Sequence, residues 1–313
     1  MKFLRKMARK IRSQLNAKFY YRRWVIGVAR VDIKEVIRQK RFDANITWLT
    51  VNKLSENYAD PFILKTDSGY DIFYERYPEN GVGDIWLMKI DENFQIESNV
   101  PIFEDTIHAS FPFLYRENGK IYMIPETARE KKLFRFEYHE HNSTVSHKDF
   151  ILHQSILDPT ILKYDDKYWL FGAKRDKETG ETYESWVYTS EKLGGPYKSH
   201  PGSPHVTGLD GIRAAGNFIK IGDVIYRPTQ NCEEEYGKSI TINRIQKLSQ
   251  TEIKEEFYMS ISIDNKMAKD GIIKIHTINS AGNVIAIDGV QRTFSITKPF
   301  KLFKKFLSSG KFF

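Results

Sequence analysis

The apolar and polar positions of this chain repeat with a long period. A small or acidic residue followed by proline or glycine opens a short apolar strand, a polar turn follows, and a second strand is rich in aromatic residues. The openings at Pro61, Pro112, Pro159, Gly216 and Gly271 lie 51, 47, 57 and 55 residues apart. Hairpins that recur about every 50 residues are typical of β-propellers, with one blade per repeat. The sequence therefore predicts an all-β fold, a five-bladed β-propeller around a central axis.

The repeats also predict how the chain is divided. Residues 1–45 lack the strand pattern and are expected to form a basic, largely helical N-terminal extension, with a short helix over 31–41 that turns Val36 and Ile37 inward. Residues 46–297 should form the propeller. Residues 298–313 are expected to form a short basic amphipathic helix at the C-terminus.

Charge is distributed unevenly along the chain. The net charge is +8, yet residues 1–23 carry nine Lys or Arg and residues 298–313 carry five Lys, and neither segment contains an acid. The segment between them is therefore negative, at −6. A basic nucleic-acid-binding core is not indicated, and we expect no nucleic-acid partner. The single cysteine, Cys232, excludes an internal disulfide framework and fits a reducing compartment.

Both basic ends have an amphipathic pattern. Phe3, Met7, Ile11 and Leu15 are four residues apart and are surrounded by Lys and Arg, and phenylalanines alternate with lysines after Pro299. Neither end has a secretory signal pattern, and no stretch approaches 18 apolar residues. We expect a cytoplasmic protein that docks on an anionic membrane surface, at the inner face of the cell membrane, through both tails. The alternatives are that the N-terminal helix packs on the propeller or binds a partner.

Two aspartates stand at the same place in separate repeats. Asp60 and Asp158 each precede the proline that opens an inner strand, and the inner strands of a propeller line its axis. Carboxylates brought together there would differ in pKa and could divide acid and base roles. Alternatively, each Asp-Pro is only a turn that begins a strand. Glu126, at the end of a second strand, is a further catalytic candidate.

A second group of candidates is basic or polar. In the fourth repeat Arg213 opens the blade, Arg227 and Gln230 follow its second strand, and Tyr236 and Lys238 lie just beyond. Because Arg binds phosphate through two N–H groups and Lys adds a point charge, this group predicts a site for a phosphate-bearing substrate. At matching positions of other repeats, His108, Ser110 and His276 are also predicted to bind substrate.

Several other chemistries lack their motifs. The chain has no glycine-rich phosphate loop, no nucleophile elbow and no Cys and His spacing that suits zinc. No metal site and no organic cofactor are predicted, and the need for a divalent metal is left open.

Three segments together resemble known families. The residues around Asp60 and Glu75 resemble the first blade of family-43 glycoside hydrolases and of their levansucrase relatives. The stretches His108-Ala-Ser-Phe-Pro-Phe113, Arg213-Ala-Ala-Gly216 and Arg227-Pro-Thr-Gln-Asn-Cys232 resemble the N-terminal propeller of plant glucosamine inositolphosphorylceramide transferases and related bacterial surface-glycan proteins. The resemblance covers about residues 46–297.

The resemblance implies roles for particular residues. In the hydrolases the Asp of the first blade is a general base, and the Asp of the third blade tunes the pKa of the catalytic groups or orients them. Asp60 and Asp158 match these two places. The hydrolases also need a general-acid Glu where this chain has Asp210-Gly211-Ile212-Arg213. A diphosphate is a good leaving group and needs cations more than an acid. The sequence thus predicts a glycosyltransferase of cell-surface polysaccharide assembly, which moves a sugar from a nucleotide-sugar donor to a lipid-linked or glycan acceptor.

Two other functions remain open. A hydrolase of the same fold would use Glu126 or Asp210 as its acid. A non-catalytic propeller would bind sugar on behalf of a partner enzyme.

Overall fold

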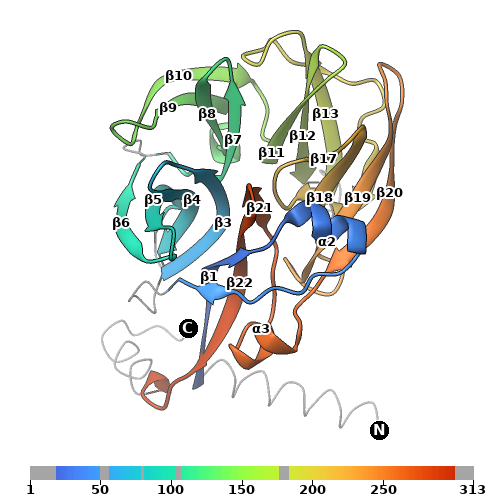
Figure 1. The fold of residues 1–313 in the computed structure, drawn as a ribbon. Coiled ribbons are helices and arrows are strands. Elements are labelled where there is room, and N and C mark those ends of the chain that lie inside the picture. The colour runs from blue at the N-terminus through green and yellow to red at the C-terminus, as the bar shows by residue number, and fades with distance from the viewer. Residues whose placement is uncertain (1–18, 50–55, 79–80, 103–106, 176–182, 300–313) are drawn as a thin grey trace, which may run out of the picture.

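The computed structural model describes residues 19–49, 56–78, 81–102, 107–175 and 183–299. Their strands form five antiparallel sheets around a common axis (Figure 1). The predicted five-bladed β-propeller is therefore confirmed. The amphipathic segments predicted for the two tails fall almost entirely outside the described residues.

Three blades are continuous in sequence and are named by their order along the chain. Blade one comprises β3 (Glu56–Lys65), β4 (Gly69–Pro78), β5 (Asp84–Asp91) and β6 (Ile96–Pro101). Blade two comprises β7 (Ser110–Glu117), β8 (Lys120–Glu126), β9 (Leu133–His139) and β10 (Thr144–Leu152), with the 3-10 helix η1 (Ala128–Glu130) between β8 and β9. Blade three comprises β11 (Leu157–Tyr164), β12 (Lys167–Arg175), β13 (Tyr183–Ser190), β14 (Lys198–Ser199) and β15 (Val206–Gly208).

The last two blades are less regular. Blade four comprises β16 (Asp210–Ala214), β17 (Ile219–Ile221), β18 (Val224–Asn231), β19 (Ser239–Leu248) and β20 (Ile253–Ile261), followed by helix α3 (Asn265–Lys269). Blade five comprises β21 (Ile278–Ala281), β22 (Val284–Phe294), β1 (Tyr20–Arg30) and β2 (Thr47–Trp48). Its inner strands thus come from the C-terminal part of the chain and its outer strands from the N-terminal part.

Strand β1 corrects the predicted boundary at residue 45. It pairs with β22 over its whole length, from Tyr20 opposite Phe294 to Arg30 opposite Val284. The two-stranded hairpin β21–β22 leaves a free strand edge, and β1 satisfies the hydrogen-bonding groups of that edge and closes the ring. The cationic residues at the start of β1 concealed its strand character, although residues 25–29 are five successive buried positions.

The predicted short helix is confirmed as α2 (Ile33–Gln39). The carboxylate of Asp32 caps it by accepting the N–H of Lys34, and Lys40 ends it in a left-handed conformation. Val36 and Ile37 are buried, as expected, against the side chains between blades four and five. The helix therefore lies beside one mouth of the ring, on the side of blade four (Figure 1), and its first residues, Ile33 and Lys34, reach that mouth.

The inner strands surround the axis and contact one another in sequence. Strand β3 contacts β7, β7 contacts β11, β11 contacts β16, and β21 contacts β3. The ring is completed where the N–H of Ile278 donates to the carbonyl of Ala215 at 2.8 Å. Apolar side chains fill the space between adjacent blades, with Phe62, Phe73 and Phe113 among the most deeply buried. The starts of the inner strands are thereby held together at one mouth.

A substitution in β1 tests whether this strand belongs to the propeller. Ile26 is 1% exposed and packs between blades five and one, so Ile26→Asp would bury an unpaired carboxylate. We expect it to lower the free energy of unfolding by more than about 4 kcal/mol. Arg22→Asp, at an exposed position of the same strand, is the control, with an expected change below about 1 kcal/mol. Thermal unfolding of both variants measures the effect. Equal melting temperatures for Ile26→Asp and the unsubstituted protein would mean that β1 is a separate extension.

Candidate active site at one mouth of the propeller

A backbone irregularity recurs at the start of three inner strands. The strand register shifts by one residue between Ala59 and Phe62, between Ser110 and Phe113, and between Leu157 and Thr160. The residue before each proline has a positive φ of 54° for Asp60, 43° for Phe111 and 46° for Asp158. Such a bulge bends the strand and redirects one side chain, and these bulges place both aspartates at the axial mouth. Left-handed backbone at non-glycine residues is strained and is often found at functional sites.

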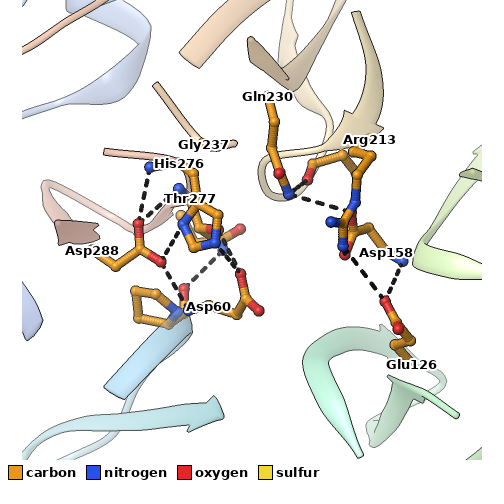
Figure 2. Close-up of polar contacts among 12 residues, drawn as sticks. Asp60, Glu126, Asp158, Arg213, Gln230, Gly237, His276, Thr277 and Asp288 are labelled. Atoms are coloured by element: carbon orange, nitrogen blue, oxygen red, sulfur yellow. Dashed lines mark hydrogen bonds and ion pairs between the residues drawn. The ribbon is translucent and has the colours of Figure 1, made fainter. Parts of the chain in front are cut away.

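Asp60 is held by the neighbouring blade. Its backbone N–H donates to Oδ2 of Asp288 at 2.9 Å, and its own Oδ1 accepts the hydroxyl of Thr277 at 2.8 Å. Asp288 is fully buried in β22, and its Oδ1 also accepts the N–H groups of His276 and Thr277 at 3.1 and 2.9 Å. One carboxylate therefore fixes the start of blade one to blade five, as Figure 2 shows.

His276 lies between these two carboxylates. Its Nδ1 is 2.7 Å from Oδ2 of Asp288, and its Nε2 is 3.6 Å from Oδ1 of Asp60. The indole of Trp24, in β1, stacks on the imidazole with ring centres 3.9 Å apart. Burial lowers the pKa of His276, but the carboxylates of Asp288 and Asp60 raise it by more, so the net pKa lies above its ordinary value.

Asp158 is held in the same way on the other side of the mouth. Its backbone N–H donates to Oε2 of Glu126, in blade two, at 3.0 Å. Its carboxylate accepts two hydrogen bonds from Arg213, at 2.6 and 2.9 Å, and one from Nε2 of Gln230 at 3.2 Å. Arg213 also lies 3.9 Å from Glu126 (Figure 2). The Arg213 guanidinium is thus already engaged with carboxylates on both sides.

The buried acids of the mouth influence one another. Burial raises the pKa of Asp60 to about 6; His276 opposes the rise, and the nearby carboxylates of Asp288 and Asp158 add to it. Burial and the charge of Asp158 raise the pKa of Glu126 to about 8, against the opposing effect of Arg213. Burial and the carboxylates of Asp60, Glu126 and Asp158 also hold the pKa of Glu75 well above its usual range. At neutral pH the mouth therefore combines an ionised Asp60 with a protonated Glu126.

The remaining predicted residues near the mouth have supporting contacts. Ser110 is buried and pairs with Glu126 across β7 and β8. Nδ1 of His108 accepts the N–H of Gly83 at 3.0 Å, and burial lowers the pKa of His108 to about 4, so this ring is neutral. The guanidinium of Arg213 lies 5.1 Å from the ring centre of Tyr236, which meets His276 edge to face.

The predicted phosphate-binding cluster of blade four is not assembled. Arg227 is 1% exposed, pairs with Glu255 at 2.9 Å and donates to the carbonyl of Gly211. Lys238 lies within 4 Å of Glu234 and Glu235. Together with the engagement of Arg213 by Asp158, these contacts leave no group of free cations where the sequence predicted one.

Asp210 and Cys232 also have local partners. Asp210 accepts the hydroxyl of Thr241 at 3.0 Å at the start of β16. Cys232 is buried, and its sulfur accepts the N–H of Gly237 at 3.4 Å. Glu126 is thus bound directly to an axial aspartate, through the N–H of Asp158, whereas Asp210 is bound to Thr241.

Sequence reasoning missed Asp288 and Trp24. Asp288 is the one charged residue in the otherwise apolar run from Val284 to Val290, a pattern that signals a buried, hydrogen-bonded carboxylate. Trp24 lay in the segment assigned to the extension. Its contact with His276 could be found only by pairing β1 with blade five.

Three of these groups come close enough to share a cation. Asp60, His276 and Asp288 each offer one atom, and these atoms lie within 4.8 Å of one another. Both oxygens of Asp288 already accept backbone N–H groups, and Asp60 accepts from Thr277. A carboxylate that accepts N–H groups has few lone pairs left for a metal, so these residues fit a structural hydrogen-bond network better than a metal centre.

Comparison with known proteins identifies the family. The model of the family described as glucosamine inositolphosphorylceramide transferase 1, N-terminal, matches residues 46–287. The chain belongs to this family. A glucosamine inositolphosphorylceramide transferase 1 of Arabidopsis thaliana is 31% identical over 239 residues, which cover 72% of this chain and 31% of the relative. A protein of the same name in Oryza sativa subsp. japonica is 26% identical over 220 residues, which cover 68% of this chain and 29% of the relative.

The chain thus spans about a third of the length of the curated relatives it matches. Among solved structures, a thermostable family-43 glycoside hydrolase superposes with a TM-score of 0.53 at 13% identity, covering 69% of this chain and 83% of that one. The family-43 protein BlXynB (K247S) of Bacillus licheniformis superposes with a TM-score of 0.52 at 14% identity, covering 71% of this chain and 52% of that one. These likenesses show a shared propeller fold.

No helix among the described residues is long and apolar enough to cross a bilayer.

The raised pKa of Glu126 predicts a pH-dependent effect on stability. A buried acid with a raised pKa binds its proton more tightly when the protein is folded, so stability falls as the pH rises from the unfolded-state pKa towards about 8. Glu126→Gln removes this loss. The amount by which its melting temperature exceeds that of the unsubstituted protein should grow by several degrees between pH 6 and pH 9. The exposed Glu130→Gln is the control and should show no such trend. A constant difference between pH 6 and 9 would contradict a protonated Glu126.

The hydrogen bonds of Asp288 predict a loss of stability on Asp288→Asn. The amide retains one acceptor oxygen and turns an NH₂ group towards backbone donors or His276. We expect a loss of about 2–4 kcal/mol in the free energy of unfolding. Asp91→Asn is a matched control, since Asp91 accepts two backbone N–H groups in a partly exposed turn, and should cost less than about 1 kcal/mol. Denaturant titrations measure the free energy of unfolding of both variants. Equal losses would show that the hydrogen bonds of Asp288 stabilise the fold no more than those of Asp91.

Proposed function

We propose that the axial mouth transfers a sugar to a hydroxyl group of a glycan or lipid-linked acceptor during cell-surface polysaccharide synthesis. The observation that carries the proposal is the pair of buried acids whose pKa values straddle neutrality, about 6 for Asp60 and about 8 for Glu126. Membership in a family named for a sugar transferase supports the same reaction class.

In this reaction Asp60 acts as the general base. Its carboxylate is ionised near neutral pH and takes the proton of the acceptor hydroxyl as that oxygen attacks the sugar. Glu126 carries a proton at the same pH and donates it, or a hydrogen bond, to the departing oxygen of the donor. Asp158, held by Arg213 and Gln230, orients the sugar between them.

The donor in the proposal is a nucleotide sugar. Its diphosphate cannot rely on a cation cluster in blade four, because Arg227 is buried in its pair with Glu255 and only the weak, exposed pairs of Lys238 could be replaced. Arg213 and His276 are the cations nearest the axial acids and are the groups that would face the leaving diphosphate. In this proposal the departure of the diphosphate depends more on the proton of Glu126 than the sequence predicted.

Hydrolysis is the second candidate, favoured by the same proton. A protonated carboxyl group opposite a carboxylate is what glycoside hydrolysis requires, and Glu126 is better placed than Asp210 to supply it. A third candidate is sugar binding without catalysis, since the chain matches only 31% of the length of its relative. These functions differ in what the purified protein releases.

A single set of assays separates the three functions. We expect turnover with at least one nucleotide sugar and an acceptor, and a loss of about 100-fold or more in kcat for Asp60→Asn and for Glu126→Gln. Asp91→Asn is the control and should retain full activity. Release of sugar from an aryl glycoside without an acceptor would favour the hydrolase. Sugar binding with no turnover of any substrate would favour the binding module and overturn the proposal.

The pH dependence provides an independent test of the acid and base roles. Asp60 must be ionised and Glu126 protonated, so kcat/KM should rise through about pH 6 and fall through about pH 8. Glu126→Gln should remove the falling limb, and Asp60→Asn the rising one, in whatever activity remains. A profile that stays flat from pH 5 to 9 would contradict both assignments.

We further propose that the basic tails hold the protein at an anionic cytoplasmic membrane surface, where lipid-linked acceptors reside. Because β1 begins at Tyr20, a variant that tests this must remove residues 1–18 and not 1–23. Removing residues 1–18 and 300–313 together should strongly reduce co-sedimentation with phosphatidylglycerol vesicles and leave the melting temperature unchanged. Undiminished sedimentation would refute docking by the tails.

A further inference from the structure

The opposite mouth of the propeller contains a cavity of about 450 Å³. Its walls are the far ends of the inner strands β7, β11, β17 and β21, and α2 covers one side. Its floor is apolar and includes Phe113, Ile161 and Ile278, which are buried. A second hollow of about 310 Å³ shares Tyr115, Arg116 and other lining residues with the first and extends it towards blade one.

The charges around this cavity have one sign. Four of its 16 lining residues are cationic and none is acidic, although the chain contains 40 acids. The cations come from separate elements: Lys34 from α2, Arg116 from β7, Lys163 from β11 and Lys220 from β17. Residues 24–297 carry a net negative charge, so a lining whose charged residues are all cationic differs in sign from the segment that forms it.

These cations retain capacity for a ligand. Among the described residues, Lys34 and Lys220 have no carboxylate within ion-pair distance; Lys220 donates to the carbonyl of Lys163 at 3.0 Å, which leaves two of its three protons free. Arg116 and Lys163 pair at 3.4 and 3.7 Å with Glu140 and Glu117, which lie outside the lining. The Arg116–Glu140 pair is exposed and contributes little, so an anion can replace that carboxylate at low cost, whereas Lys163 stays paired with the less exposed Glu117.

Neutral donors accompany the cations. The side chains of Ser280 and Asn217 line the cavity, and neither has a hydrogen-bond partner within the described part of the chain. Like charges gathered around one hollow repel one another, and a bound anion with several acceptor oxygens removes that repulsion. Phosphate matches this set, because its three terminal oxygens accept from lysine, arginine and hydroxyl groups at once.

We propose that this cavity binds a phosphate-bearing ligand, with Lys34 and Lys220 as its principal contacts. The apolar floor accommodates the organic part of the ligand, and a cavity of this size holds a small metabolite or a lipid headgroup. The site is separate from the acidic mouth that holds Asp60 and Glu126, and it does not depend on the reaction proposed there.

The test uses the full chain and two probes, inorganic pyrophosphate and vesicles with or without phosphatidylglycerol. Calorimetric titration with pyrophosphate should show binding that weakens about tenfold or more in the double variant Lys34→Gln/Lys220→Gln. Lys198→Gln, an exposed lysine of blade three outside the cavity, is the control and should bind like the unsubstituted protein. Because Lys34 and Lys220 are both exposed, the double variant should keep its melting temperature.

The two probes distinguish the source of the phosphate. Weaker pyrophosphate binding in the double variant supports a soluble ligand. If only co-sedimentation with phosphatidylglycerol vesicles decreases, the ligand is a lipid headgroup. If neither probe distinguishes the double variant from Lys198→Gln, the cavity is not a phosphate site and the proposal fails.

Discussion

The axial site depends on the hydrogen bond that each bulged aspartate donates to an acid of the preceding blade. The extra residue of a bulge is left out of the strand ladder, and a buried N–H without an acceptor is costly. Asp288 of blade five accepts the N–H of Asp60 in blade one, and Glu126 of blade two accepts that of Asp158 in blade three. The same contacts hold the blades in register and concentrate negative charge at one mouth.

This concentration of charge has a chemical consequence. Several carboxyl groups cannot all ionise when they are buried side by side, so their pKa values separate. The cations decide which groups remain ionised: Arg213 is committed to Asp158, and His276 lies between Asp288 and Asp60. Glu126 is left with its proton. The contacts that hold the bulges thereby produce an acid and a base at one mouth of the propeller, as sugar chemistry requires.

Part of this arrangement could be predicted from the sequence. The period of the hairpins predicted the five blades, and the matched Asp-Pro openings predicted that Asp60 and Asp158 face the axis. Arg227 was predicted to bind phosphate, and the structure buries it in a pair with Glu255, 28 residues away. The sequence could not predict this pair, because it does not show which glutamate faces an arginine. Strand β1 was missed because its partner, β22, lies more than 250 residues away and pairing over that distance leaves little local signal. Asp288 could have been recognised as a lone charge in an apolar strand.

The central claim is that Glu126 is protonated and Asp60 is ionised at neutral pH in the folded protein. Carboxyl ¹³C NMR, with resonances assigned by Glu126→Gln and Asp60→Asn, measures both groups directly between pH 4 and 10. We predict that Glu126 titrates near 8 and that Asp60 titrates near 6. A Glu126 resonance that titrates near pH 4.5, like an exposed glutamate, would contradict the account.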